Sequence, residues 1–93
     1  MDGPRLEDFE GTIGETWELA LGSGALPVRL VAAQALPRAM RAEGGFRLEW
    51  LGPADPFLPQ GTYHFRRDGR GVDMFVVPVA KAGEGYRYEA IFN

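Results

Sequence analysis

Hydrophobic and polar residues alternate along several short stretches of this chain, and this period-two pattern predicts β-strands. The alternation is clearest in residues 46–51, where Phe46, Leu48 and Trp50 share one face. Successive side chains of a strand point to opposite faces, so the pattern predicts one buried and one exposed face. The same alternation recurs in residues 16–21, 62–67 and 86–92.

Two further strands are predicted from other signals. Residues 28–34 lie between Pro27 and Pro37, which shorten any helix and favour a strand. The alanine-rich stretch 31–35 leaves a helix open on propensity alone. Residues 72–79 are apolar on both faces, so both faces of that strand require burial.

The dipeptide Asp68-Gly69 is the strongest turn signal, because a type I′ hairpin turn needs positive φ at both central residues. The turn also sets the register of the two strands around it. The pairs that it predicts are Phe65 with Val72, Tyr63 with Met74 and His64 with Asp73.

Two segments are expected to cover the sheet. Leu6, Phe9 and Ile13 recur at near-helical spacing after Pro4, which predicts one short helical turn that plugs one end of the sheet structure. Residues 52–61 contain three prolines and predict a rigid loop that folds its apolar pair, Phe57 and Leu58, over the core. Residues 38–44 are expected to form an exposed connection.

These elements predict an all-β fold, a six-stranded antiparallel meander that forms a small barrel or sandwich, with a short N-terminal helical turn. The chain has 93 residues, of which 45% are hydrophobic and 25% charged, so it can bury one core. No repeat or linker interrupts it. We therefore expect residues 1–93 to form a single domain.

Charge and cysteine content argue against several classes of function. The 13 acidic and 10 basic residues give a net charge of −3 with no long run of either sign, which argues against nucleic-acid binding. No apolar stretch approaches a membrane span, and residues 1–8 lack the apolar core of a signal peptide. Without cysteine there is no disulfide framework, and we expect a protein of the reducing cytoplasm with no membrane partner.

Candidate chemistry is sparse. His64 is the only histidine, and a catalytic triad would have to join it to Asp73 and to Ser23, which lies between glycines in a turn. The carboxylates show no converging pair, and the glycine clusters match no phosphate-binding pattern. We therefore expect no enzyme activity, and we assign no catalytic, cofactor-binding or metal-binding residue.

The second face of residues 72–79 is the most informative surface. One face should meet the core, whereas the other is covered by the 57–58 loop, by the N-terminal turn, or by a protein partner or second subunit. The interaction surface that this hypothesis predicts consists of Phe57, Leu58, Phe75, Val77 and Val79.

Three segments of the chain are similar to a known family: residues 57–63 (FLPQGTY), 75–79 (FVVPV) and 88–93 (YEAIFN). They resemble a family of short bacterial proteins that carry a domain of unknown function. The similarity extends from Leu6 to the end of the chain, although residues 36–43 match no pattern. The resemblance implies no activity, cofactor or site residue, and it implies an accessory role in a phage-tail-like or related bacterial assembly.

The function expected from these observations is that of a non-enzymatic protein-interaction or structural accessory domain. The alternative is a small-molecule-binding barrel of unknown ligand, in which aromatic side chains line a pocket instead of filling a core. The residues that the alternative would use are Trp17, Trp50, Tyr63 and Tyr88.

Overall fold

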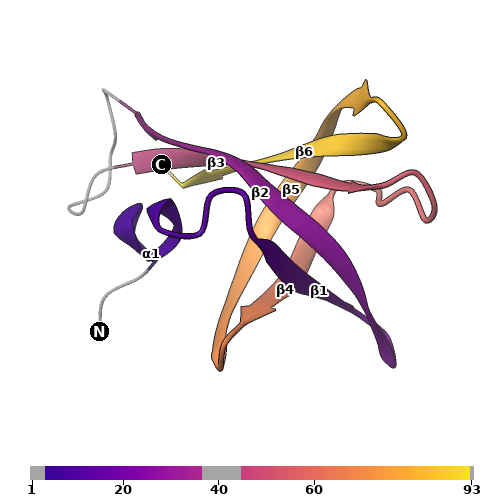
Figure 1. Cartoon of the computed structure of the whole chain (residues 1–93), viewed down its shortest axis with the longest axis horizontal. Coiled ribbons are helices and arrows are strands. Elements are labelled where there is room, and N and C mark those ends of the chain that lie inside the picture. The colour runs from indigo at the N-terminus through magenta and orange to yellow at the C-terminus, as the bar shows by residue number, and fades with distance from the viewer. Residues whose placement is uncertain (1–3, 37–44, 93) are drawn as a thin grey trace.

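A computed structural model describes residues 4–36 and 45–92 (Figure 1). Within these residues the elements are α1 (Glu7–Glu10), β1 (Thr16–Leu21), β2 (Gly24–Leu36), β3 (Gly45–Pro53), β4 (Gly61–Arg67), β5 (Arg70–Ala82) and β6 (Gly85–Phe92). All the predicted strands and the short helical turn are confirmed. The alanine-rich stretch belongs to β2, which excludes the helix. The connection expected at 38–44 lies outside the described residues.

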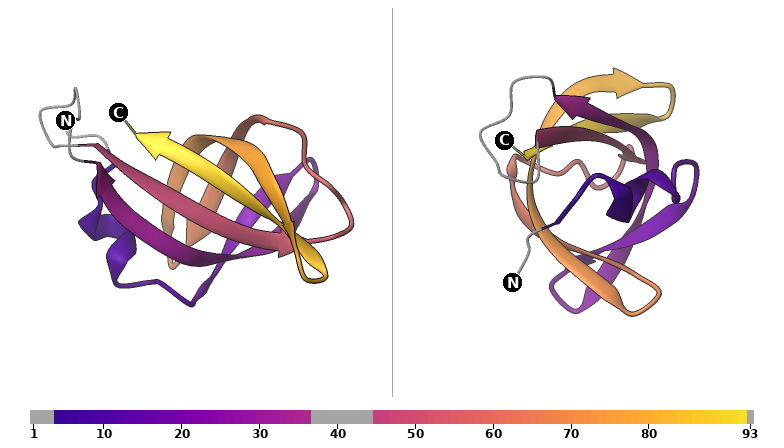
Figure 2. Two further views of the ribbon diagram at one scale, coloured as in Figure 1. Left: turned by 90° about the horizontal axis from the view of Figure 1, so that it is seen from above. Right: turned by 90° about the vertical axis from the view of Figure 1, so that its left-hand side faces the viewer.

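The six strands form one antiparallel sheet that closes into a ring (Figure 2). Their order is β1-β2-β3-β6-β5-β4, and β4 pairs back with β1. This confirms the all-β fold of six antiparallel strands, which lie in one sheet that closes in a ring. The meander is interrupted once, because β3 pairs with β6 and the chain crosses the end of the ring before β4 begins.

The register around the β4–β5 turn is the predicted one. Asp68 and Gly69 have φ values of 50° and 79°, as a type I′ turn requires. The pairs Phe65 with Val72, Tyr63 with Met74 and His64 with Asp73 all form. A turn of two residues therefore determined which side chains of β4 and β5 face the interior.

A continuous series of aromatic rings fills the inside of the sheet. Each ring lies 4.5–5.9 Å, centroid to centroid, from the next, which is the range for favourable aromatic contacts. All but the first are fully buried. In spatial order the rings are Phe92, Phe46, Phe9, Trp17, Trp50 and Phe65.

The helix α1 lies across one opening of the ring, as the right-hand view of Figure 2 shows. Phe9 is fully buried there, against Trp17 and Phe46. A polar tether fixes its position, because Trp17 Nε1 donates to Thr12 Oγ1 at 3.1 Å and that hydroxyl donates to the Phe9 carbonyl at 2.9 Å. The predicted plug is thus present. Over the described ranges, no helix has the length and apolarity needed to cross a membrane.

Ile13 does not belong to the plug, contrary to the predicted helical spacing. Its side chain is 48% exposed. The helix ends at Glu10, and the chain then turns through Gly14 with a φ of 90°. Helical periodicity therefore no longer applies at position 13.

Proline 27 lies inside β2, although its position suggested a strand boundary. β2 pairs with β3 only from Arg29 onward, so Pro27 lies just beyond the end of that ladder. Pro78 is placed similarly in β5, whose ladder with β4 ends at Val76. A proline at such a place removes no ladder hydrogen bond on that side, and it discourages pairing with another chain.

Phe9→Ala should lower the free energy of unfolding by about 3–5 kcal/mol, because the change removes the buried ring that closes one end of the sheet. The matched control is Ile13→Ala, which truncates an exposed side chain four residues away and should cost less than about 1 kcal/mol. Urea denaturation followed by tryptophan fluorescence measures both. Equal losses for the two variants would contradict the plug.

Gly85→Ala should also destabilise the fold, since a Cβ at this position would collide with the backbone carbonyl oxygen of Gly52 on β3. We expect a loss of roughly 1–3 kcal/mol, as for other overpacked sites. Gly11→Ala is the control, because no atom lies within 4 Å of its added Cβ and its φ is −74°. Thermal unfolding should show a lower Tm for Gly85→Ala alone, and an unchanged Tm would mean that β3 and β6 can separate at little cost.

Candidate functional site

The outward side of β5 and β6 carries a group of exposed apolar side chains. Phe75 is 51% exposed, Val79 47% and Ile91 49%, and Val77 between them is half-buried. Because Val76 pairs with Ala90, Phe75 and Ile91 occupy neighbouring outward positions on the two strands. We call these four residues, Phe75, Val77, Val79 and Ile91, the outer apolar face.

The opposite side of β5 contributes to the core, as the sequence predicted. Met74 and Val76 are 3% and 1% exposed. The other face of β5, with Phe75, Val77 and Val79, is the one for which a covering segment was expected. Neither the 57–58 loop nor α1 buries these side chains. Ile91 was missing from the predicted surface. The alternation of Tyr88, Ala90 and Phe92 toward the inside was the signal that could have placed it outward.

Leu58 is not part of the surface, which corrects the prediction. It is 3% exposed, and its backbone N–H donates a hydrogen bond to the buried Tyr88 hydroxyl at 3.0 Å. The loop does fold over the core through this residue, as expected. Phe57 remains 49% exposed and packs edge-on against Tyr86, near the other end of β6 from Ile91. The loop thus separates its two apolar residues, because only one of them reaches the interior.

A network of charged side chains borders the outer apolar face on β3 and β6. Arg47 donates to Glu89 at 2.9 Å and also to Glu49 and to Gln34. Hydrogen bonds to Glu49 and Glu89 raise the pKa of the Arg47 guanidinium above its ordinary value. Arg87 lies 3.6 Å from Glu49 in the same network. These charges neutralise one another beside the apolar residues, so this border has no net charge.

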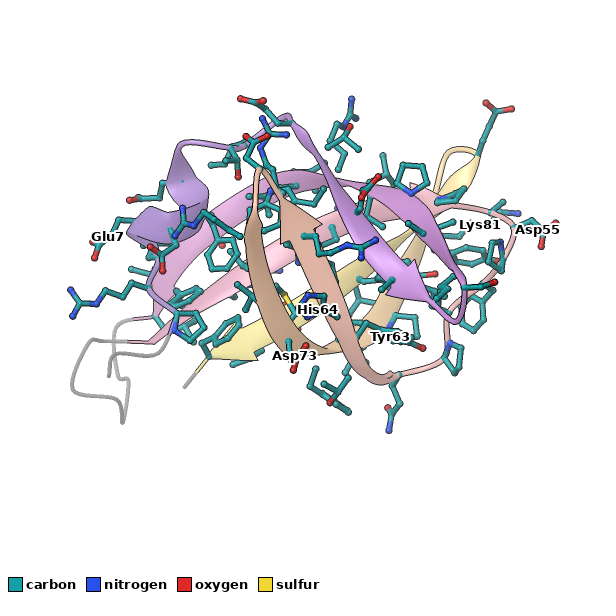
Figure 3. All side chains as sticks on the ribbon, turned by 90° about the horizontal axis from the view of Figure 1, so that it is seen from below. Glu7, Asp55, Tyr63, His64, Asp73 and Lys81 are labelled. Carbon is teal, nitrogen blue, oxygen red and sulfur yellow. The ribbon has the colours of Figure 1, made fainter. Side chains whose placement is uncertain are left out.

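His64 and Asp73 form the predicted pair, with 2.7 Å between Nδ1 and Oδ1 (Figure 3). Both side chains lie on the outside of the ring and are 45% and 71% exposed. The imidazole covers Gly71, where a Cβ would lie 2.7 Å from the ring. Thr16 lines the hollow beside this pair, whereas Ser23, the nucleophile considered from the sequence, does not.

This hollow, of about 470 Å³, lies beside the β4–β5 turn and is rich in arginine. Each arginine has an acidic partner, and the pairs are Arg66 with Glu18, Arg67 with Glu15 and Arg70 with Asp8. The acidic partners offset the positive charge that a phosphate would need. Among the described residues, no group of three His, Cys, Asp or Glu side chains is arranged to hold a metal ion.

The aromatic residues of the small-molecule alternative occupy the interior as packed side chains. Trp17, Trp50 and Tyr88 are at most 2% exposed, and the two indoles contact each other at 5.6 Å. Tyr63 is half-buried and its hydroxyl donates to the Pro59 carbonyl. A second hollow, of about 570 Å³, lies at the ring end among residues such as Pro27, Leu51 and Pro53, and none of the four aromatic residues lines it.

Tyr88→Phe should free the 54–60 loop, because it leaves the buried Leu58 N–H without its acceptor. We expect a loss of about 1–3 kcal/mol in unfolding free energy and faster amide hydrogen exchange at Leu58. Tyr63→Phe is the matched control, since its hydroxyl also bonds the loop but is exposed. Similar exchange rates at Leu58 in the wild-type and Tyr88→Phe proteins would show that the hydrogen bond does not hold the loop.

The three segments that carry the family resemblance meet in the structure. The first includes Leu58 and leads into β4, the second lies in β5, and the third lies in β6 as far as Phe92. The β4–β5 and β5–β6 ladders join them. The model of one protein family, described as a domain of unknown function (DUF6916), matches residues 4–92. Searches of the curated proteins and of the solved structures each found no match. Since the match covers nearly the whole chain, this protein belongs to the DUF6916 family of uncharacterised domains.

Proposed function

We propose that this domain acts by binding protein through the outer apolar face, as a non-enzymatic interaction or structural accessory domain. One observation carries the proposal: Phe75, Val79 and Ile91 are each about half exposed on two adjacent strands. Single exposed apolar residues are ordinary on a protein surface, whereas a contiguous group of large ones marks an interaction site. Burial of such side chains is the main driving force of protein association.

The position of these residues supports the proposal. β5 and β6 are each paired along both sides over part of their length, so the side chains project from a backbone that is held in place. The Arg47 network stiffens the neighbouring border, because three hydrogen-bond partners restrain one guanidinium. A face that is ordered before binding loses less conformational entropy when it binds.

The setting that we propose is a multiprotein assembly in a bacterial cytoplasm, of the phage-tail-like kind that the family resemblance implies. The lack of cysteine in the sequence supports a reducing compartment. The exposed apolar face is evidence for association with another protein, whichever assembly contains the domain.

Photo-crosslinking in cells of the source organism tests the proposal. A benzophenone amino acid replaces Phe75 in one variant and Ile91 in another, and it replaces Ala25 in the control. Ala25 is exposed on β2, which lies opposite β5 in the strand order. We expect covalent protein adducts from positions 75 and 91 and none from position 25. Adducts equally weak at all three positions would contradict binding through this face.

A further inference from the structure

We infer that a partner protein adds an extended segment to the free edge of β5, beside the outer apolar face, as one more strand of the sheet. The inference rests on the proposed function and gives the form of the partner. It follows from the direction of the backbone groups of β5, from the prolines at other strand edges and from the side chains beside this edge.

The first part of β5 extends beyond the end of its neighbour β6. The ladder between the two strands begins with Val76 opposite Ala90, so among the described residues 70–75 have no ladder pair with β6. The two strands separate toward the end of the ring where α1 lies (Figure 1), and Arg70 there bonds Asp8 of α1 at 2.9 Å. This part of β5 is therefore paired with β4 alone.

The β4–β5 turn determines where the backbone groups of this stretch point. The residues that flank a two-residue hairpin turn exchange both of their backbone hydrogen bonds, and such bonded pairs then alternate along the ladder. Counted from this turn, Val72 and Met74 direct their N–H and C=O groups toward β4. Gly71 and Asp73 direct theirs to the opposite side, which β6 does not reach. These groups form a short, regular edge to which an extended backbone can bond.

Two other stretches that extend past a neighbouring strand contain a proline, whereas this one does not. Pro27 lies where β2 extends past β3, and Pro78 lies where β5 extends past β4. Each proline occupies a position whose N–H would otherwise point away from the paired strand, and such prolines keep other chains from pairing. Residues 70–75 contain neither proline nor lysine. The edge beside Phe75 therefore lacks the protection that the other two edges have.

Apolar side chains lie on both faces of the sheet at this edge. Phe75 and Ile91, each about half exposed, lie on the outer face where β5 and β6 separate. Val72 faces the inside of the ring opposite Phe65 and is only half-buried. Paired strands bring side chains on the same face to within about 5 Å of one another. We therefore expect the added segment to carry apolar residues on both of its faces, as β5 itself does.

Amide hydrogen exchange of the purified full chain tests whether the edge is free. The N–H groups of Gly71 and Asp73 should exchange about tenfold faster, relative to their intrinsic rates, than those of Val72 and Met74, which bond β4. Equal protection of all four amides would overturn the inference, because the edge would then already be bonded.

A proline at position 73 tests whether the partner bonds the backbone. Asp73→Pro removes the N–H that points away from β4, and the matched control Asp73→Ala removes the same carboxylate but keeps the N–H. The readout is the yield of protein adducts from the benzophenone at position 91, in cells of the source organism. We expect a yield about tenfold lower for Asp73→Pro and nearly unchanged for Asp73→Ala. Circular dichroism checks that both variants fold.

The purified adduct without a substitution at position 73 gives a measurement that does not depend on the proline. In this adduct the Gly71 and Asp73 amides should exchange about tenfold more slowly than in the free chain. Mass spectrometry should place the crosslink on the partner within a run of apolar residues. Unchanged exchange, a crosslink in a polar segment, or yields that are the same for Asp73→Pro and Asp73→Ala would overturn strand addition but preserve the proposed function. No adducts at all would overturn both.

Discussion

The series of six aromatic rings inside the sheet is the interaction on which the rest of the structure depends. The ladder that closes the ring, between β1 and β4, joins only Glu18 with Arg66 and Leu19 with Phe65. Hydrogen bonds at this seam are few, so side-chain packing must hold the strands together. Trp50 from β3 supplies it by contacting Trp17 of β1 and Phe65 of β4. The same series extends to Phe9, which places α1 over the opening.

Closure of the ring also explains why one apolar face stays exposed. The interior has room for one side of each strand, and on β5 the side that carries Met74 and Val76 occupies it. The other side of β5 is apolar as well, but α1 lies at the ring opening and the 54–60 loop directs Leu58 inward. No described segment is left to cover Phe75 and Val79. The side chains inside a closed sheet fill its interior, so its outer side remains available to other molecules. This is the physical basis of the proposed association.

Much of the fold could be predicted because its signals are local. Alternation identified the strands, and the Asp68-Gly69 turn set the register that pairs Tyr63 with Met74. The predictions failed where the environment of a residue depends on contacts with distant parts of the chain. Pro27 was read as a boundary, but a proline is compatible with a strand where the neighbouring strand has not begun to pair. Ile13 was read as helical, and Leu58 as part of a surface, because their exposure depends on where the chain turns next.

The sequence by itself determined the strand content, the inward faces and the apolar character of both sides of β5, since these follow from residue type and a period of two. Only the tertiary structure decided that β3 pairs with β6, that the sheet closes, and that Ile91 joins Phe75 and Val79 in one group. These depend on which strands become neighbours, and neighbours far apart in the chain leave no periodic signal. The interaction surface needed both kinds of information, because composition made it apolar and closure of the ring left it uncovered.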